Sequence, residues 1–392
     1  MKKFILMIVV MFFIATFFII EYKTYSKDEI TLLDNTEVRA MYLSYIELDK
    51  YLDVSSDSEA KKNIDSIISN LYNDKFNVLI LHVIAFSDSI YPSDIYLLRD
   101  SVSKLNFDVL EYFIEEAHKY NIDVHAWVNP YRISSSDSYI INETHPAYKF
   151  INTNSIKTIS SKGIYYNPSS DDVISLIVSG VEEIVSNYDI DGIHFDDYFY
   201  PSNDIDLENY ELYINSGGDM TIDEYRYDNV LRMISSVSNS IKSINDSVEF
   251  GISPQGNIDN NYSSVYLDVK SLLSSNYIDY IMPQIYFGFE NSNKPFIDTI
   301  NEWSSLIKNS SIDLIPALSL YKSGSEDKYA GSGINEWIDH TDILKRQIIF
   351  SRRVNYYSGF SIFRYDYFYN SDKWNDNMIK EIDNVKKVIK EY

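Results

Sequence analysis

The 392-residue sequence predicts an α/β fold, specifically a (β/α)8 barrel of the TIM type, and two observations support this prediction. Short apolar runs alternate with longer segments of helical periodicity, and this pairing occurs eight times along the chain. A helix between successive strands predicts parallel pairing, because a parallel connection needs a crossover. Eight such units fit a closed barrel better than an open doubly wound sheet, which usually has fewer strands.

The expected strands are short and apolar, and they occupy residues 38–44, 77–83, 123–129, 192–196, 249–253, 280–284, 314–319 and 359–363. The expected helices have one apolar face and occupy residues 59–75, 107–120, 171–187, 222–245, 267–274, 295–308, 342–356 and 374–390, of which 267–274 has the weakest pattern. Long connections follow the third and fourth strands, at 130–170 and 198–221. Both lead from a strand to a helix, so we expect them at the C-terminal face of the barrel, where barrel enzymes hold their active sites.

The N-terminus predicts a membrane segment. Lys2 and Lys3 precede an apolar run at residues 4–20, which only Thr16 interrupts. No small-residue cleavage site follows, so a retained transmembrane or signal-anchor helix at 1–22 is favoured over a cleaved signal peptide. The basic end then stays cytoplasmic, residues 23–36 form a tether, and 37–392 form an extracytoplasmic barrel domain on the cell-wall side. Cleavage would make the domain a secreted one.

Composition excludes several classes of function. The chain has 34 Lys and Arg against 58 Asp and Glu, a net charge of −24, which repels phosphate backbones, so nucleic acid is not an expected partner. The absence of Cys excludes disulfides, thiolate metal sites and Cys nucleophiles. The 6 His show no zinc-binding spacing, and no dinucleotide or phosphate-loop motif occurs, so we expect neither metal nor cofactor.

The principal catalytic candidates are Asp196 and Asp197, at the expected end of the fourth strand. Neighbouring residues of a strand face opposite sides, so only one of them points into the barrel mouth unless the strand is already turning there. Glycosidases use two carboxylates, one as nucleophile or base and one as acid, about 5–5.5 Å apart for retention and about 6.5–9.5 Å for inversion. The alternative for either residue is a capping or ion-pairing role.

Aromatic and polar residues near the same strand ends suit a carbohydrate site. A tyrosine stacks on the C–H face of a sugar and also offers a hydroxyl, and the chain has 35 of them. The candidate sugar-binding tyrosines are Tyr131, Tyr198, Tyr200, Tyr286 and Tyr321, although with so many tyrosines several belong to the ordinary core or surface. The polar candidates at the ends of buried strands are Asn129, Arg132 and Gln284, which would fix a ligand or orient a carboxylate.

Several motifs together resemble a known family. They are His125-Ala-Trp-Val-Asn-Pro-Tyr-Arg132, Tyr166-Asn-Pro168, Asp191-Gly-Ile-His-Phe-Asp-Asp-Tyr-Phe-Tyr-Pro201, Phe250-Gly-Ile-Ser-Pro254, Asp279-Tyr-Ile-Met-Pro-Gln-Ile-Tyr286 and Leu320-Tyr-Lys322. From about Val38 to Phe363 the chain resembles the glycosyl-hydrolase-like family of extracytoplasmic bacterial TIM barrels, first catalogued as a domain of unknown function, which includes the divisome-localized glycosyl hydrolase. The resemblance implies a barrel that hydrolyses cell-wall glycan at the strand-four motif. Separately, Lys322 is expected at the barrel mouth, where its charge would offset the net negative charge locally and bind substrate.

The chain departs from this family pattern after the second strand. Where the family commonly has Gln-Val-Arg-Pro, this chain has His82-Val-Ile-Ala85, although Asp88 is retained. Loss of the Arg removes an orienting group and puts the identity of the substrate in doubt. Phe287 stands where a Trp is often found, and no Cys is available for the lipid anchor of many members, so the N-terminal helix would replace it.

The pattern from Asp191 to Asp196 is also similar to the fourth strand of the α-amylase and chitinase superfamilies. The amylase-like interpretation makes Asp196 the nucleophile. A chitinase-like enzyme would need a Glu two residues later, where this chain has Tyr198, so substrate-assisted hydrolysis of that kind is disfavoured. The general acid is then Asp197, with Glu47, Asp88 and Glu290 as alternatives on the rim.

The leading hypothesis is a membrane-anchored glycoside hydrolase that cuts a β-linked amino-sugar polymer of the peptidoglycan type. Asp196 must stay ionised, held by Arg132, whereas burial among aromatic side chains raises the pKa of the acid. One alternative is a catalytically silent barrel that only binds glycan, which the altered strand-two motif motivates. Another is a transglycosylating enzyme on the same scaffold, since the same carboxylates serve both reactions.

Overall fold

The structure is a computed structural model that describes residues 36–391, and its main sheet is entirely parallel. The nine strands of this sheet lie in the order β12-β11-β10-β9-β5-β2-β1-β14-β13. Their bounds are β1 (Val38–Leu43), β2 (Val78–Ile84), β5 (Asp123–Val128), β9 (Gly192–Phe195), β10 (Glu249–Ile252), β11 (Tyr280–Ile281), β12 (Asp313–Leu314), β13 (Ala317–Ser319) and β14 (Gly359–Phe363).

The sheet curls so that its two ends meet in one stretch of chain, residues 313–319. Strands β12 and β13, which stand at opposite ends of the strand order, are separated only by Ile315 and Pro316. On one side the Ile315 amide donates to the Ile281 carbonyl at 3.0 Å, and on the other the Ser361 amide donates to the Pro316 carbonyl at 3.0 Å. The predicted α/β class is therefore confirmed, and of the predicted (β/α)8 barrel the structure shows a curled parallel sheet in a TIM-barrel-like fold.

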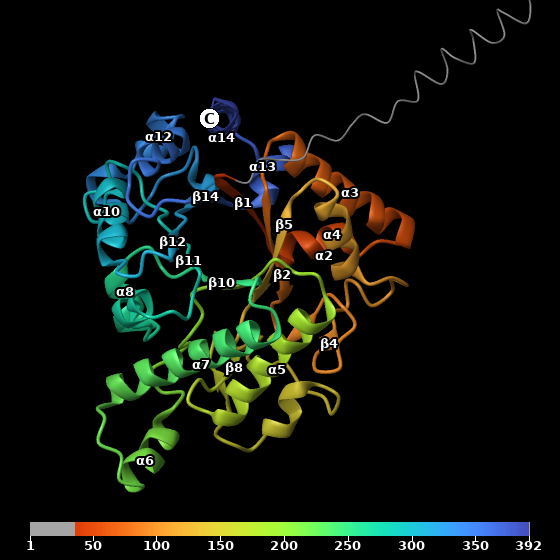
Figure 1. The fold of residues 1–392 in the computed structure, drawn as a ribbon, viewed down its shortest axis with the longest axis vertical. Coiled ribbons are helices and arrows are strands. Elements are labelled where there is room, and N and C mark those ends of the chain that lie inside the picture. The colour runs from red at the N-terminus through yellow and green to blue at the C-terminus, as the bar shows by residue number, and fades with distance from the viewer. Residues whose placement is uncertain (1–35, 392) are drawn as a thin grey trace, which may run out of the picture.

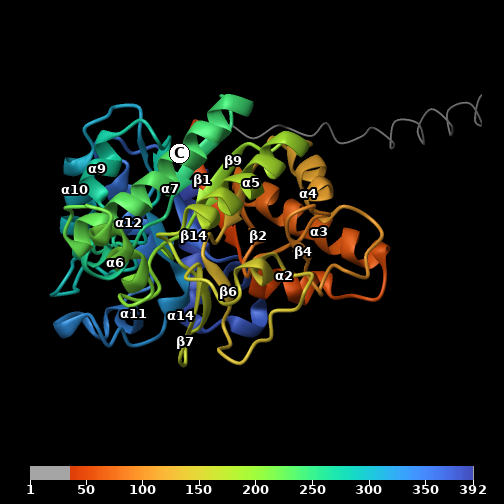
Figure 2. The ribbon, with the colours of Figure 1, turned by 90° about the horizontal axis from the view of Figure 1, so that it is seen from below.

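Helices surround the sheet (Figure 1). Helices α3 and α4 lie on one side of the strands and α10 and α12 on the opposite side, and in Figure 2 the strands β1, β2, β9 and β14 lie at the centre. The helix bounds are α2 (Tyr45–Leu52), α3 (Asp57–Asn73), α4 (Val109–His118), α5 (Asp171–Asn187), α6 (Leu207–Asn215), α7 (Ile222–Ile244), α8 (Ile258–Ser264), α9 (Val269–Ser274), α10 (Phe296–Leu306), α11 (Glu336–Asp339), α12 (Ile343–Ser351), α13 (Tyr365–Tyr369) and α14 (Asp376–Lys390). The weak pattern at 267–274 forms α9, and α8 before it was not predicted.

The strands separate two layers of core. In β2, Leu79, Leu81 and Val83 belong to the large cluster between sheet and helices, whereas Val78 and Ile80 belong to a smaller inner cluster. This is the two-residue alternation of a strand, and it puts His82 on the inner face as well. The other members of the inner cluster are Ala40, Tyr42, Trp127, Tyr280, Met282, Ile315 and Ala317.

The long connections carry short elements that periodicity did not predict. After β5 the chain forms an antiparallel sheet with strand order β6-β8-β7. Its strands are β6 (Arg132–Ser134), β7 (Ile156–Ile159) and β8 (Gly163–Tyr166). Gly163 is required there, because a Cβ atom would lie 2.0 Å from the Ser134 carbonyl oxygen. The remaining short elements are β3 (Asp88–Ser89), β4 (Leu97–Leu98), and the 3-10 helices η1 (Pro146–Phe150), η2 (Leu320–Lys322), η3 (Gly331–Gly333) and η4 (Ser371–Lys373).

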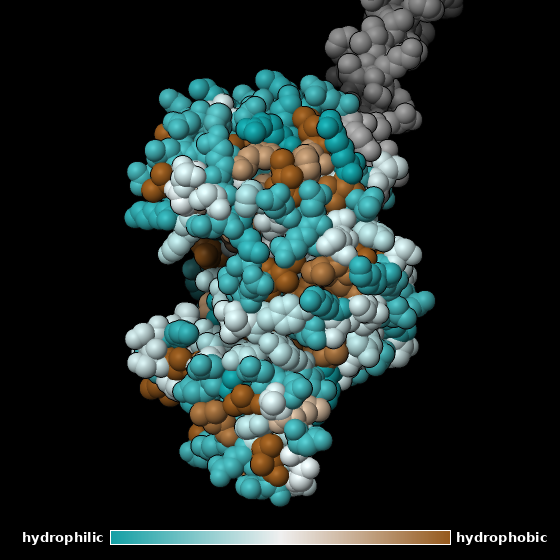
Figure 3. Space-filling model, turned by 90° about the vertical axis from the view of Figure 1, so that its left-hand side faces the viewer, coloured by the Kyte–Doolittle hydropathy of each residue, from teal (hydrophilic) through white to brown (hydrophobic). Residues whose placement is uncertain are grey.

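The described part of the chain contains no helix that is long and apolar enough to span a bilayer. The predicted anchor at 1–22 and the predicted tether, apart from Thr36, lie outside the described residues. The face in Figure 3 is largely hydrophilic with scattered hydrophobic side chains, in keeping with a core that collects most of the apolar residues.

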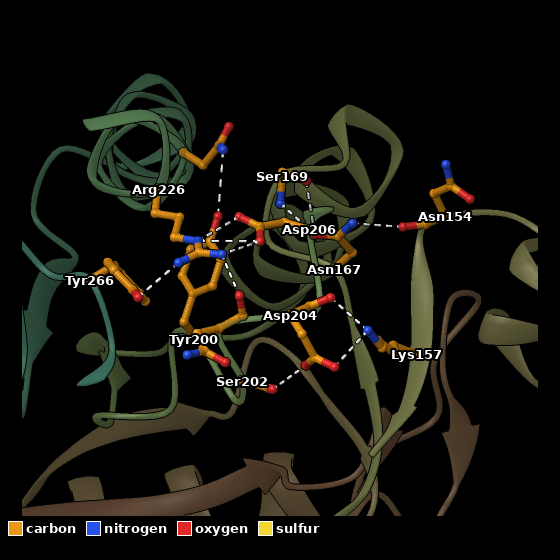
Figure 4. A network of polar contacts seen from close by, with 12 residues as sticks. Asn154, Lys157, Asn167, Ser169, Tyr200, Ser202, Asp204, Asp206, Arg226 and Tyr266 are labelled. Atoms are coloured by element: carbon orange, nitrogen blue, oxygen red, sulfur yellow. Dashed lines mark hydrogen bonds and ion pairs between the residues drawn. The ribbon is translucent and has the colours of Figure 1, made fainter. Parts of the chain in front are cut away.

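A buried ion pair fixes the long connection after β9 to helix α7 (Figure 4). Arg226 is 3% exposed and Asp206 is fully buried, and Arg226 Nε donates to Asp206 Oδ2 at 2.9 Å. The same guanidinium donates to the Asn203 carbonyl and, at 2.8 Å, to the Tyr266 hydroxyl. The Tyr200 ring packs edge-on against Tyr266 with centroids 5.2 Å apart. The connection after β9 begins at Asp196 and Asp197, and this network fixes it to α7 at Asp206.

We predict that Arg226→Leu lowers the free energy of unfolding by about 3–5 kcal/mol, because it leaves the buried Asp206 carboxylate without its partner. The measurement is denaturant unfolding at neutral pH. A matched control is Arg232→Leu on the same helix, whose side chain is 42% exposed and paired with the exposed Asp171. The control substitution should lower the free energy of unfolding by no more than about 1 kcal/mol. Equal losses in the two variants would contradict this account.

Candidate functional site

A cavity of about 340 Å³ opens at the C-terminal ends of the parallel strands. Residues from both the inner face of the sheet and the following connections form its wall. They are Tyr42, Ser44, Tyr45, Ile46, His82, Trp127, Arg132, Asp196, Asp197, Tyr198, Ser253, Gln284, Tyr286, Tyr321, Phe363 and Arg364. Most of these side chains are aromatic or uncharged polar groups, which is typical of a site that binds a neutral polar ligand such as a sugar.

Asp196 and Asp197 both line this cavity. Strand β9 ends at Phe195, so the alternation that would send neighbouring side chains to opposite faces has already ended. Both carboxylates therefore reach the barrel mouth, rather than one of them alone. Among residues 36–391, these two are the carboxylates of the cavity wall.

Asp196 is held by hydrogen-bond donors. It is 3% exposed, and its Oδ2 accepts from Trp127 Nε1 at 3.0 Å and from Asn129 Nδ2 at 3.3 Å. Its Oδ1 accepts from the Tyr198 amide at 3.2 Å. For Asp197 the contact is different, since Gln284 Nε2 donates to its Oδ1 at 3.3 Å. The hydrogen-bond partners of Asp196 are all donors, and they oppose the rise in its pKa that burial and the charge of Asp197 cause.

The two carboxylates titrate as a pair. Burial, followed by the negative charge of Asp197, raises the pKa of Asp196 to about 7, while Arg132, the Tyr198 amide and Trp127 oppose the rise. Burial also raises the pKa of Asp197, against the hydrogen bond from Gln284. The site therefore keeps a proton at a higher pH than free carboxyls would, as a general acid requires.

Arg132 does not bind Asp196 as the sequence suggested. Its charge lowers the pKa of Asp196, but the guanidinium lies 4.5 Å from the Phe86 ring centroid and 4.8 Å from that of Tyr198. Its Nε donates to the Ala85 carbonyl at 3.4 Å. The positions of the Asp196 oxygens are set by Trp127 and Asn129 instead, so Arg132 acts on the carboxylate through its field alone.

Five of the predicted substrate-binding residues lie in the cavity wall, namely Arg132, Tyr198, Gln284, Tyr286 and Tyr321. Tyr198 is 46% exposed, and its ring lies over the guanidinium of Arg132. Tyr286 and Tyr321 meet edge-on with centroids 6.0 Å apart. The aromatic rim that the sequence predicted is therefore present, although with a smaller set of residues than expected.

The other predicted binding residues lie outside the wall. Asn129 is buried behind Asp196, and Tyr131 and Tyr200 are buried in the large core cluster. Lys322 is occupied, since its Nζ donates to the Tyr286 carbonyl at 2.6 Å and pairs with Asp327 at 2.7 Å. Asp88 lines a separate cavity and is paired with Arg99 at 2.8 Å. These residues support the site from behind or belong to other parts of the fold.

The three alternative acids are also placed away from the cavity wall. Glu47 is buried, pairs with Arg364, and accepts from the Asp366 amide at 3.2 Å, so it fixes the start of α2 to the end of β14. Glu290 is exposed and pairs with His340 at 3.3 Å. With Asp88 paired to Arg99, Asp197 is the acid candidate that the fold brings beside Asp196.

Sequence reasoning missed several residues of the wall, above all Trp127, His82 and Tyr42. The Trp127 ring stacks on His82 with centroids 3.7 Å apart, and Tyr42 meets Trp127 edge-on at 5.4 Å. The signal was available for Trp127, because it alternates with His125 and Asn129 on one face of the third expected strand. The Tyr280 hydroxyl joins His125 Nδ1 at 2.9 Å and His194 Nδ1 at 3.0 Å, so both histidines are hydrogen-bonded groups of the barrel interior. No cluster of metal-ligating side chains occurs between residues 36 and 391.

Comparisons with known proteins show the family to which the chain is similar. The family model described as glycosyl hydrolase-like 10 matches residues 37–331. The chain is 30% identical to the glycosyl hydrolase YngK of Bacillus subtilis (strain 168) over 330 residues, 77% of this chain and 62% of the relative. It is 32% identical to the glycosyl hydrolase DigH of Escherichia coli (strain K12) over 286 residues, 67% of this chain and 64% of the relative. The match therefore spans less than two thirds of the length of each relative.

Solved structures show the same fold at low identity. The glycoside hydrolase domain of PgaB (BpsB) from Bordetella bronchiseptica has a TM-score of 0.59 and 12% identity, covering 90% of this chain and 98% of that one. The α-L-fucosidase isoenzyme 2 from Paenibacillus thiaminolyticus has a TM-score of 0.57 and 13% identity, covering 90% and 49% respectively. These likenesses concern the fold.

Proposed function

The chain belongs to the glycosyl hydrolase-like 10 family, as its motifs indicated, and from this premise we propose that it is a glycoside hydrolase acting on a cell-wall glycan of the peptidoglycan type. The observation that carries the proposal is a pair of adjacent carboxylates with raised pKa values, Asp196 and Asp197, in a cavity lined by aromatic side chains. Aromatic rings and uncharged polar groups suit pyranose rings, and two carboxylates are the usual machinery of glycosidic cleavage.

In the proposed reaction Asp196 is the nucleophile and Asp197 the general acid. Asp196 accepts hydrogen bonds from Trp127, Asn129 and the Tyr198 amide, and these donors favour the ionised form. In the reacting state the proton is on Asp197, so a proton that the raised pKa of Asp196 holds there in the free chain must first leave. Asp197 then gives its proton to the glycosidic oxygen as Asp196 attacks the anomeric carbon. Asp197, now ionised, takes a proton from the water that releases the sugar from Asp196.

The proposed setting is the cell membrane, with the barrel on the cell-wall side and the apolar run at residues 4–20 as its anchor. Two basic residues before the run favour this orientation. An anchored barrel would meet glycan within reach of its tether, which suits a polymeric and immobile substrate.

The test of function is product analysis with the purified full chain. The substrates are intact peptidoglycan, peptidoglycan stripped of its peptides, and N-acetylated chitin oligomers, and the products are identified by mass spectrometry. We expect fragments with a new reducing end from one of the two wall polymers. Binding without any product would instead favour a silent glycan-binding barrel, and oligomers longer than the starting material would favour a transglycosylase.

A further inference from the structure

The imidazole of His82 lies in the wall of the cavity, and no side chain of the described chain hydrogen-bonds it. Strand β2 puts it on the inner face above Val78 and Ile80, and the residue is 1% exposed. Within residues 36–391 neither Nδ1 nor Nε2 has a partner of good hydrogen-bond geometry, and the Ile84 backbone acts on the ring only weakly. Buried polar atoms in folded proteins are nearly always hydrogen-bonded, so an unpaired side chain facing a cavity calls for an explanation.

The neighbours of His82 are aromatic rings that cannot satisfy it. Trp127 stacks on one face with an interplanar angle of 15°, and Tyr45 meets it edge-on at 5.6 Å. Stacking of this kind fixes the plane of the imidazole without engaging its nitrogens. The ring is thus held rigidly, with its two polar atoms left for another partner.

The imidazole is neutral under ordinary conditions. Burial lowers the pKa of His82 well below its usual value, and the positive charges of Arg99 and Arg132 lower it further. A neutral imidazole offers one N–H donor and one nitrogen acceptor. Ser253, on the wall of the same cavity, has a buried hydroxyl whose one interacting side chain in the described residues is Tyr42, at poor hydrogen-bond geometry.

We propose that His82 is a substrate-binding residue whose imidazole donates one hydrogen bond to, and accepts one from, the neutral hydroxyl or acetamido substituents of the sugar ring seated beside Asp196. The inference rests on the proposed function and adds to it a specificity-determining residue. The link to the reacting carboxylate is short, because Trp127 stacks on His82 and donates to Asp196. A sugar that fills the cavity would supply the partners that the protein itself does not.

The test compares His82→Phe with His82→Gln in the full chain, each in an Asp197→Asn background that slows turnover. Phe keeps a flat ring for Trp127 but has no polar atom, whereas Gln restores one neutral donor and one acceptor. The probe is N-acetylated chitotetraose, and the dissociation constant is measured by calorimetry. We expect His82→Phe to weaken binding about tenfold to a hundredfold and His82→Gln to recover most of the loss. The melting temperature of His82→Phe should not fall.

The outcomes separate this inference from the proposed function. Equal affinity of His82→Phe and its parent would overturn the inference alone and leave His82 as a stacking partner of Trp127. A parent that neither binds the oligosaccharide nor cleaves either wall polymer would overturn both. For a parent that cleaves wall polymer without binding the oligosaccharide, the released wall fragment replaces chitotetraose as the probe. Where His82→Phe fails to fold, His82→Leu replaces it with the same expected loss of affinity.

Discussion

The Asp196→Asn variant should lose about 10³- to 10⁵-fold in turnover of cleavable glycan while remaining folded, because the amide keeps the shape of the carboxylate but cannot serve as a nucleophile. Trp127 and Asn129 would still find an oxygen to which they donate. The measurement is the rate of appearance of new reducing ends at neutral pH. A suitable control is Asp189→Asn, since Asp189 lies in the same motif but its side chain is 93% exposed.

Asp196→Asn should also change the stability of the folded chain, by an amount that depends on pH. The pKa of Asp196 is raised from 3.8 to about 7 in the folded chain, so the protonated form is the one that folding favours. The stabilisation that protonated Asp196 contributes is complete below the pKa of the unfolded state. It is lost as pH rises through the pKa of the folded state. Asn cannot ionise, so Asp196→Asn should gain in melting temperature relative to the parent between about pH 4 and about pH 8. Retained turnover would contradict the assignment of Asp196 as the nucleophile. A difference in melting temperature that stays constant across this pH range would contradict the raised pKa of Asp196.

Local patterning predicted the framework and part of the site. Apolar runs followed by amphipathic segments placed the principal strands within a few residues, because burial on both faces leaves a signal in the sequence. The two-residue alternation also explains the inner position of Trp127 and His82. The motif around Asp196 indicated the chemistry. Burying two consecutive carboxylates after a strand has an unfavourable desolvation free energy, so such a pair indicates a functional role.

The remaining features depend on where a strand ends and on what packs above it, and neither is encoded locally. Whether Asp196 and Asp197 share a cavity depends on β9 stopping at Phe195. Tyrosine serves equally well in a core and on a rim, so sequence could not separate the buried Tyr131 and Tyr200 from Tyr198. Likewise, the partner of Arg226 is 20 residues away and becomes visible only in the folded chain.

The roles of the two carboxylates make a second prediction, which concerns the leaving group. Asp197→Asn should lower turnover of glycan by about 10²- to 10⁴-fold, since it removes the proton that the departing oxygen needs. On an aryl glycoside such as a 2,4-dinitrophenyl N-acetylglucosaminide, the leaving anion is stable without a proton. There the loss should shrink to about tenfold or less, whereas Asp196→Asn should remain inactive on both substrates.

This comparison distinguishes the two assignments without relying on the size of either defect. Removal of the acid should also abolish the alkaline limb of the pH profile, because the parent loses activity as the pair gives up its shared proton. Equal losses on glycan and aryl glycoside in Asp197→Asn would mean that Asp197 is not the acid. A reversal, in which Asp196→Asn is the variant rescued by the activated leaving group, would exchange the two roles. Since the donors around Asp196 favour its ionised form, we expect the first pattern.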